Sequence, residues 1–194
     1  MPLTKKIFRE NCFRKIKRIS KLSRFYRNAK INLSIQKELK NIKNKRVLVY
    51  NSLEFEANIT KSIKKLRKKC DIFVPFMQGE SFKMVPFRLP LKKNRFGIYE
   101  AGKSLKNIYK IDIAIVPIVG IDGNLQRVGF GKGMYDRFFA KLKKRPYTIF
   151  VQTKLCYTKE IICDDYDIAC DVLITPCIKV KNRGHGYIRT GKRC

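Results

Sequence analysis

The sequence predicts an α/β protein, a single three-layer α/β/α domain around a mostly parallel sheet, with basic N-terminal helices and an irregular C-terminal tail. Short β-branched runs alternate with segments of helical periodicity, which is typical of parallel sheets covered on both faces. A chain of 194 residues, 44% of them hydrophobic, is long enough to bury one full core. No internal repeat or low-complexity linker divides it. We therefore expect one domain over residues 1–180 and a basic tail over 181–194.

The first half of the chain predicts helices followed by strands. Over 4–28 and 32–42, apolar residues recur near helical spacing with lysines and arginines between them. A short β-rich run at 46–50 predicts the first strand, and a helix is expected from about 59 to 69. Residues 72–75 form the next strand. Residues 81–91 alternate in polarity, which indicates a further strand or a hairpin.

The second half predicts the centre of the sheet. Residues 111–117 are strongly apolar and β-branched, as a buried parallel strand should be. A helix over 134–143 would bury Phe138, Phe139 and Leu142. The runs 147–151 and 171–175 complete the strands, and an irregular tail is expected after Val180.

Composition excludes several classes of protein. No apolar run approaches the roughly 18 residues that a membrane span needs, and the N-terminus has no apolar signal core, so we expect a cytoplasmic protein. In that compartment the seven cysteines should be reduced. Cys156, Cys163, Cys170 and Cys177 recur every seven residues, but this spacing matches no zinc pattern. We interpret them as buried or incidental thiols.

The net charge of +30 admits two interpretations. It is typical of nucleic-acid binding through phosphate neutralisation, and it also fits lysines spread over solvated faces. The bases concentrate in 1–46 and 179–193, while the middle of the chain resembles an ordinary enzyme. We expect incidental affinity for polyanions, and we keep a basic RNA- or ribosome-associated protein as the alternative.

The segment 126–137, QRVGFGKGMYDR, carries the clearest functional signal. Three glycines at alternate positions free the backbone to turn its N–H groups toward one point, and a helix is expected to begin directly afterwards. Lys132 and Arg127 add charge suited to phosphate oxygens, and Asp136 suits a hard cation such as Mg²⁺. The segment fits neither the Walker A pattern nor the dinucleotide fingerprint. The alternative is a tight strand-to-helix turn with a solvated lysine.

With these residues the chain resembles the 5-formyltetrahydrofolate cyclo-ligase family, whose hallmark is approximately R-(L/I)-G-x-G-(G/K)-G-Y-Y-D-R after a strand ending in V-P. Here Val116-Pro117 precedes the hallmark, and Met134 stands where the family usually has tyrosine. Residues 96–101, FGIYEA, look like F-G-I-x-E-P, and 167–175 look like the family's D-x-x-V-D-x-x-I-T ending. The resemblance spans roughly residues 5–178.

The resemblance implies conversion of 5-formyltetrahydrofolate and ATP into 5,10-methenyltetrahydrofolate, ADP and phosphate, with Mg²⁺. Phosphoryl transfer to the formyl oxygen makes it a leaving group, and N10 then closes the ring. Such chemistry relies on positioning and charge stabilisation rather than on side-chain acid–base steps. His185, in the predicted tail, is therefore expected to be incidental. The implied partners are ATP and a reduced folate, and we expect a monomer.

The resemblance also implies site residues. Lys132 and Arg127 would be catalytic, and Asp136 and Asp171 would hold magnesium. Glu56 would contact the folate, with Glu54 as its substitute. The nucleotide would be bound by Lys5, Arg9, Arg127, Val128, Gly129, Phe130, Gly131, Lys132, Gly133, Met134 and Tyr135, of which Phe130 and Met134 would also border the folate.

Two questions stay open at this stage. Phe82, Met84 and Phe87 either line the pocket for the flat rings or pack in the core. A protein of related fold that binds another phosphorylated metabolite also fits the altered Met134 and Ala101.

Overall fold

The computed structural model describes residues 2–19, 21–88, 92–93, 99–100, 108 and 110–182. Within them, seven strands form one mixed, mostly parallel sheet in the order β11-β10-β9-β6-β1-β2-β3. The parallel strands are β1 (Arg46–Leu48), β2 (Asp71–Gln78), β6 (Ile113–Pro117), β9 (Tyr147–Val151) and β10 (Val172–Ile174). Antiparallel strands β3 (Ser81–Pro86) and β11 (Lys179–Lys181) form the two edges. The α/β fold class predicted from the sequence is confirmed.

Two short ribbons stand outside this sheet. One pairs β7 (Gly120–Ile121) with β8 (Arg127–Val128), and the other pairs β4 (Lys92–Lys93) with β5 (Tyr99–Glu100). The ribbon β7–β8 continues directly from β6 and leads into the glycine segment. It therefore determines where the glycines lie relative to the sheet.

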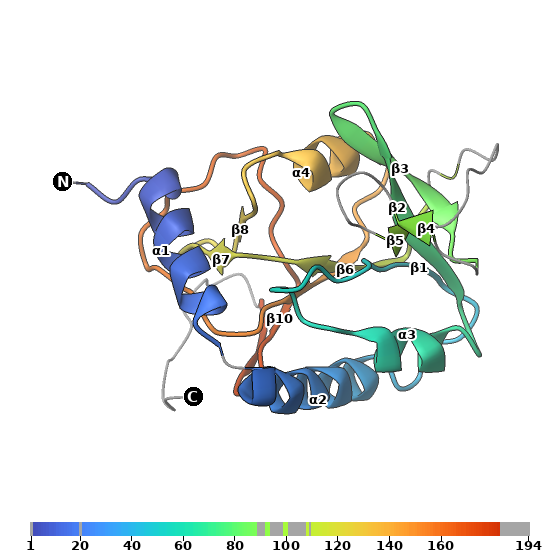
Figure 1. Ribbon diagram of the computed structural model, residues 1–194. Helices are drawn as coiled ribbons and strands as arrows, with labels where there is room; N and C mark the ends of the chain where they lie inside the picture. The colour runs from blue at the N-terminus through green and yellow to red at the C-terminus, as the bar shows by residue number, and fades with distance from the viewer. Residues whose placement is uncertain are drawn as a thin grey trace.

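Helices cover both faces of the sheet. Helices α2 (Lys21–Glu38) and α3 (Thr60–Leu66) lie below the sheet in Figure 1, and the short helix α4 (Met134–Phe139) lies above it. Ile31 and Ile35 of α2 pack with the sheet residues of one core cluster. Phe138 and Phe139 of α4 pack into the cluster on the opposite face.

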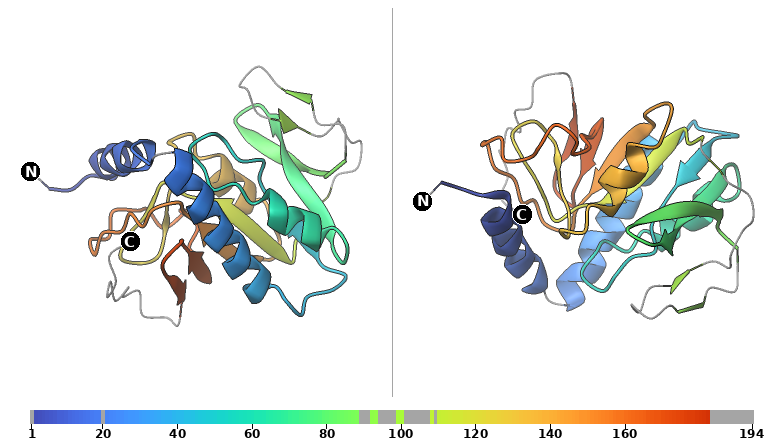
Figure 2. Two further views of the ribbon diagram at one scale, coloured as in Figure 1. Left: turned by 60° about the horizontal axis from the view of Figure 1, so that its bottom comes forward. Right: turned by 90° about the horizontal axis from the view of Figure 1, so that it is seen from above.

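Helix α1 (Lys5–Lys17) lies beside the sheet and covers neither face (Figures 1 and 2). Its apolar residues Phe8, Cys12 and Ile16, spaced by four, pack against Val119 and Val128 of the β7–β8 ribbon. The approach is close, since a Cβ added at Gly120 would lie 2.5 Å from the Phe8 ring. This docking brings the N-terminus to the glycine segment.

The observed helix boundaries correct the prediction. The chain turns after Lys17 and the next helix starts at Lys21, whereas periodicity suggested helices over 4–28 and 32–42. The apolar residues of α1 and α2 pack against different parts of the molecule, so one continuous helix could not bury both sets. Helix α4 ends at Phe139 and not at 143.

The cysteines also depart from the prediction of reduced thiols. Cys12 of α1 and Cys156, which follows β9, form a disulfide. Cys70, Cys163 and Cys170 are free. The two bonded cysteines lie 144 residues apart in sequence, and only the docking of α1 on the ribbon brings them together.

The parallel strands give the sheet two distinct ends. At the carboxyl ends of β6 and β9 lie α1, the ribbon β7–β8 and the glycine segment. At the amino ends lie the loops from α2 to β1 and from α4 to β9 (Figure 1). Among the described residues, no helix is long and apolar enough to cross a membrane. The motif at 96–101 and His185 lie outside the described residues or their described side chains.

Candidate functional site

Two adjoining cavities lie at the carboxyl end of the sheet. The first, about 390 Å³, is mostly apolar and is lined by Tyr50, Asn51, Leu53, Glu56, Pro75, Met77, Phe82, Pro117, Arg127, Phe130, Lys132, Gly133, Met134 and Tyr135. The second, about 350 Å³, is lined by Lys5, Arg9, Arg127, Gly129, Gly131, Gly133, Asp136, Arg137, Ala140, Tyr166 and Asp167. We call them the apolar cavity and the cationic cavity. Arg127 and Gly133 line both, so the two spaces meet at the glycine segment.

The glycines of this segment serve two different purposes. Gly131 has φ +97° and Gly133 has φ +56°, backbone conformations that strain other residues. A Cβ at Gly129 would instead lie 2.3 Å from Nη1 of Arg127. Gly131 and Gly133 therefore allow the turn between the cavities, and Gly129 leaves room for the side chain of Arg127.

Arg127 is a buried cation, only 5% exposed, at the end of β8. Its Nε donates to the carbonyl of Pro117 at 3.3 Å, and its Nη1 lies 3.6 Å from a carboxylate oxygen of Asp136. The guanidinium also lies over the ring of Tyr135, 4.8 Å from its centroid. These contacts hold one positive charge at the junction of the two cavities in a fixed orientation.

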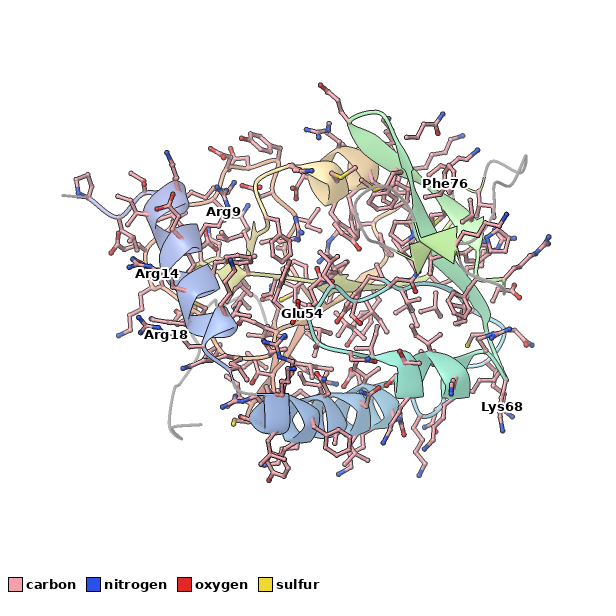
Figure 3. All side chains as sticks on the ribbon, viewed as in Figure 1. Arg9, Arg14, Arg18, Glu54, Lys68 and Phe76 are labelled. Carbon is pink, nitrogen blue, oxygen red and sulfur yellow. A yellow bond between two sulfur atoms is a disulfide. The ribbon has the colours of Figure 1, made fainter. Side chains whose placement is uncertain are left out.

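Helix α1 adds two further bases, Arg9 and Lys5, to the lining of the cationic cavity. Arg9 extends from α1 toward the glycine segment (Figure 3), and its Nε donates to the carbonyl of Gly129 at 2.9 Å. Lys5 forms ion pairs with Asp167 and, at 3.3 Å, with Asp164. Burial acts to lower the pKa of Lys5, but the hydrogen bond and charge of Asp167 outweigh it and raise the pKa above its usual value. Lys5 therefore remains charged in the cationic cavity.

Asp167 and Tyr166 were not among the predicted site residues, although both line the cationic cavity. Asp167 accepts a hydrogen bond from the backbone N–H of Asp164 at 2.8 Å besides its contact with Lys5. The sequence contained Asp167 only as part of a family-like ending. Its place opposite α1 depends on a tertiary contact across 162 residues.

Asp122 is a third residue that sequence reasoning missed. Its fully buried carboxylate accepts four backbone N–H groups, those of Asn124, Gln126, Ile162 and Cys163, at 2.9–3.3 Å. It thereby joins the ribbon that carries Arg127 to the loop that carries Asp167. The Asp122-Gly123 pair, a common hairpin-turn signal, could have indicated this turn but not its second set of contacts.

Among the residues that the structure describes, Glu56 supplies the one carboxyl group that lines the apolar cavity. Its Oε2 accepts from the N–H of Leu53 at 2.9 Å. Burial raises the pKa of Glu56 to about 7, against the opposing effects of that hydrogen bond and of Arg127. Glu54, labelled in Figure 3, is exposed and lines neither cavity. Of the two glutamates that the sequence left open, only Glu56 reaches the cavity.

Aromatic residues form much of the wall. Phe130 packs edge-on against Phe13 of α1 at 5.8 Å between centroids and tilted against Phe55 at 5.1 Å, which ties the glycine segment to the helix. Phe82 lines the cavity, as do Met134 and Tyr135. Met84 and Phe87 do not line it and pack in the two core clusters.

Val128 and Lys132 were also predicted to bind the nucleotide, and they lie in different surroundings. Val128 is fully buried under α1, so only its backbone borders the site, and its carbonyl accepts from Val119 at 3.0 Å. Lys132 is exposed and lines the apolar cavity beside the turn.

The two residues predicted to hold magnesium are not brought together. Asp136 lines the cationic cavity, where it contacts Arg127 and accepts from the N–H of Ile168 at 3.4 Å. Asp171 lines neither cavity. Its carboxylate accepts from Arg145 at 2.9 Å and from the N–H of Thr148 at the amino end of β9. No group of three or more His, Cys, Asp or Glu suited to a metal occurs among the described residues.

The model of the 5-formyltetrahydrofolate cyclo-ligase family matches residues 3–176, a range that includes both cavities. The chain belongs to this family. It is 26% identical over 148 residues to a probable 5-formyltetrahydrofolate cyclo-ligase of Schizosaccharomyces pombe, covering 61% of this chain and 72% of that protein. It is 28% identical over 116 residues to the 5-formyltetrahydrofolate cyclo-ligase of Haemophilus influenzae, covering 55% and 59% of the two chains.

The fold is also that of a solved relative. The structure of the 5,10-methenyltetrahydrofolate synthetase of Aquifex aeolicus superimposes with a TM-score of 0.79 at 23% identity, over 97% of this chain and 98% of the other. At this identity the match concerns the fold alone. It agrees with the mixed seven-stranded sheet described above.

Proposed function

We propose that this protein converts 5-formyltetrahydrofolate and ATP into 5,10-methenyltetrahydrofolate, ADP and phosphate, acting as a cytoplasmic monomer. Membership of the family supports the reaction. The single structural observation that carries the proposal is that Arg127 and Gly133 line both cavities. A reaction that moves a phosphoryl group onto a flat organic molecule needs two such adjoining spaces, one for each substrate.

In this proposal the cationic cavity takes the triphosphate. Lys5, Arg9 and Arg127 supply positive charge on three sides, and the glycine turn allows phosphate oxygens to approach the backbone closely. The apolar cavity takes the pterin and its formyl group. Its walls of Phe82, Phe130 and Met134 suit flat rings, and the carboxyl group of Glu56 gives it one polar partner for ring N–H groups.

The proposed chemistry has two steps. The formyl oxygen attacks the γ-phosphorus, the bond to the ADP oxygen breaks, and an imidate phosphate forms on the folate. N10 then attacks the activated carbon, the carbon–oxygen bond breaks, and phosphate leaves with the electron pair while N10 loses its proton. Arg127, fixed by Pro117 and Asp136, lines both cavities and would therefore reach the transferred phosphate and the formyl oxygen. Its charge stabilises the oxygens on which negative charge develops.

A magnesium ion fits this site in part. Nucleotide enzymes hold Mg²⁺ with one or two carboxylates and the phosphates themselves. Asp136 supplies such a carboxylate within the cationic cavity, and we propose it as the protein ligand. The ion would neutralise phosphate charge when bound. Asp171, engaged by Arg145 at the opposite end, has no comparable place, so the proposed site rests on Asp136.

The test is the near-ultraviolet absorbance of the methenyl product. Purified protein is mixed with 5-formyltetrahydrofolate, ATP and Mg²⁺, and the rise in absorbance is followed. We expect a rise that requires ATP and that falls at least tenfold in Lys132→Ala. Lys159→Ala is the matched control, because Lys159 is also exposed but lines neither cavity.

Two outcomes would contradict the proposal. If the folded protein binds Mg·ATP by calorimetry but gives no rise with folate, the chain acts on another substrate. If Lys132→Ala and Lys159→Ala lose activity equally, Lys132 has no specific role in the reaction. Circular dichroism of each variant establishes that it is folded.

A further inference from the structure

A third cavity lies at the other end of the sheet and takes no part in the proposed reaction. Its volume is about 1820 Å³, several times that of either cavity at the carboxyl end. It is formed where the amino ends of β1, β2, β6 and β9 meet the loops that precede them, and Phe73 and Tyr147 form its aromatic walls. We call it the amino-end cleft. In Figure 1 the amino end of β1, which lines it, lies on the side of the sheet away from α1.

The amino-end cleft is strongly basic. Its lining includes seven bases, Lys45, Arg46, Lys110, Lys141, Lys143, Lys144 and Arg145, and three acids, Glu38, Asp71 and Asp112. Two of the acids are already engaged. Glu38 pairs with Lys179 and Lys181, and Asp112 accepts from the backbone N–H of Arg46. Most of the positive charge of the cleft is therefore not neutralised within the protein.

The lysines of the cleft are also unlike the bases of the reaction site. Lys45, Lys110, Lys141, Lys143 and Lys144 are all exposed, and among the described residues their side chains form no ion pair or hydrogen bond that the structure records. They come from three loops far apart in sequence. Because β1, β6 and β9 are parallel neighbours, those loops meet at the amino end of the sheet.

We propose that the amino-end cleft binds single-stranded RNA. Free lysines around a concave surface suit a flexible chain of phosphates, which can bend to meet several of them. A membrane surface is flat and would reach the rim alone. Tyr147, 37% exposed and held by the hydrogen bond from its hydroxyl to Glu38, offers an ordered ring on which a base can stack. This role accounts for charge that the proposed reaction does not use.

The first experiment is a titration of the whole protein with a fluorescent 20-nucleotide oligouridylate, followed by anisotropy at several salt concentrations. Each phosphate contact to a single strand contributes about 0.7 to the slope of log K against log salt. Saturating Mg·ATP is present in one series. We expect tight binding at low salt, with an affinity that Mg·ATP leaves unchanged, because the two sites lie at opposite ends of the sheet.

Two triple variants with the same net charge separate a site from general attraction. Lys141→Gln/Lys143→Gln/Lys144→Gln removes three charges from the cleft. Lys15→Gln/Lys21→Gln/Lys159→Gln removes three exposed charges that line none of the three cavities. We expect the cleft variant to lower the salt slope by about 2 and the affinity by about 10- to 100-fold. The control should change the affinity less than threefold.

Several results would overturn the proposal. Equal losses in both variants would show attraction to the net charge alone. Displacement of the oligonucleotide by Mg·ATP would place it in the cationic cavity. Binding to phosphatidylserine vesicles that needs the three cleft lysines, with no binding to oligouridylate, would assign the surface to a membrane. Circular dichroism and turnover of both variants, expected to match the unmodified protein, exclude misfolding as the cause of a loss.

Discussion

The two ends of the sheet are both basic, yet they hold their charges in different ways. At the carboxyl end three cations are held by contacts with the protein: Arg127 contacts Pro117 and Asp136, Arg9 contacts Gly129, and Lys5 contacts Asp167. At the amino end the lysines are exposed and without recorded partners in the part of the chain that the structure describes. The first arrangement fixes charges in space. The second leaves them free to move.

This difference determines what each end can bind. A fixed, buried guanidinium can stabilise charge that develops at one atom, because it needs no reorganisation at the moment of reaction. Exposed lysines on flexible side chains lose entropy with every contact and are screened by salt. They suit a repetitive ligand with many equivalent phosphates. On the two proposals made above, the net charge of +30 would serve two functions that the sequence alone could not separate.

The largest expected effect comes from exchanging a fixed cation for a neutral residue. Arg127→Gln should lower the turnover of 5-formyltetrahydrofolate by about 10²- to 10³-fold, as is usual when one charge-stabilising donor is removed. The matched change at the amino end, Lys143→Gln, should alter turnover less than twofold. Initial rates from the absorbance assay measure both. Similar rates for the two variants would show that the fixed position of Arg127 has no catalytic role.

A second test removes the covalent bond that holds α1 at the carboxyl end. The double variant Cys12→Ala/Cys156→Ala frees α1 to move relative to the ribbon. Its free energy of unfolding should fall by about 2–4 kcal/mol, the usual contribution of a disulfide that closes a long loop. Urea denaturation measures it, with Cys70→Ala, a free thiol, as the control. An unchanged midpoint would mean that packing alone holds α1.

The sequence predicted more of the fold than of the site, for a physical reason. Strand periodicity is local, and 147–151 was predicted with the bounds that β9 has. The glycine segment was also recognisable, because its alternate glycines and bases are adjacent in sequence. Asp167, Asp122 and the Cys12–Cys156 bond depend on contacts across 30 or more residues, for example from Asp122 to Ile162. No local pattern encodes such contacts, so none was predicted.

The amino-end cleft illustrates the same limit. Its lysines were visible in the sequence, where they looked like a bias spread over the whole chain. Only the parallel order of β1, β6 and β9 shows that three separate loops lie around one hollow. The composition gives the net charge of the chain, but the strand order determines where the charged loops come together.

The carboxyl end also holds an acid away from water, because the carboxyl group of Glu56 lines the apolar cavity. Its folded-state pKa of about 7 lies above the roughly 4.3 of an unfolded chain. The folded protein therefore binds the extra proton between these values, and stability falls as the pH rises from about 4 through 7. Glu56→Gln cannot ionise, so it should gain about 3–4 kcal/mol over the unmodified protein at pH 8 and almost nothing at pH 4.

Chemical denaturation at pH 4, 6 and 8 checks the effect of Glu56. Glu54→Gln is the control, because Glu54 is exposed and lines neither cavity. A gain for Glu56→Gln that is the same at all three pH values would contradict a buried, titrating carboxyl group.

The smallest effect separates backbone strain from site geometry. Gly133 and Gly79 have nearly the same dihedral angle, φ +56° and φ +58°, but Gly79 has nothing within 4 Å of an added Cβ, whereas Gly133 lines both cavities. Alanine at either position should cost about 1 kcal/mol of stability through the left-handed backbone. Only Gly133→Ala should also raise the KM for ATP, by about tenfold, because its methyl group would lie 3.0 Å from Nη1 of Arg137, whose side chain lines the cationic cavity and would have to move. If both variants raise the KM alike, strain spreads through the fold and the glycine segment does not act as a local anion site.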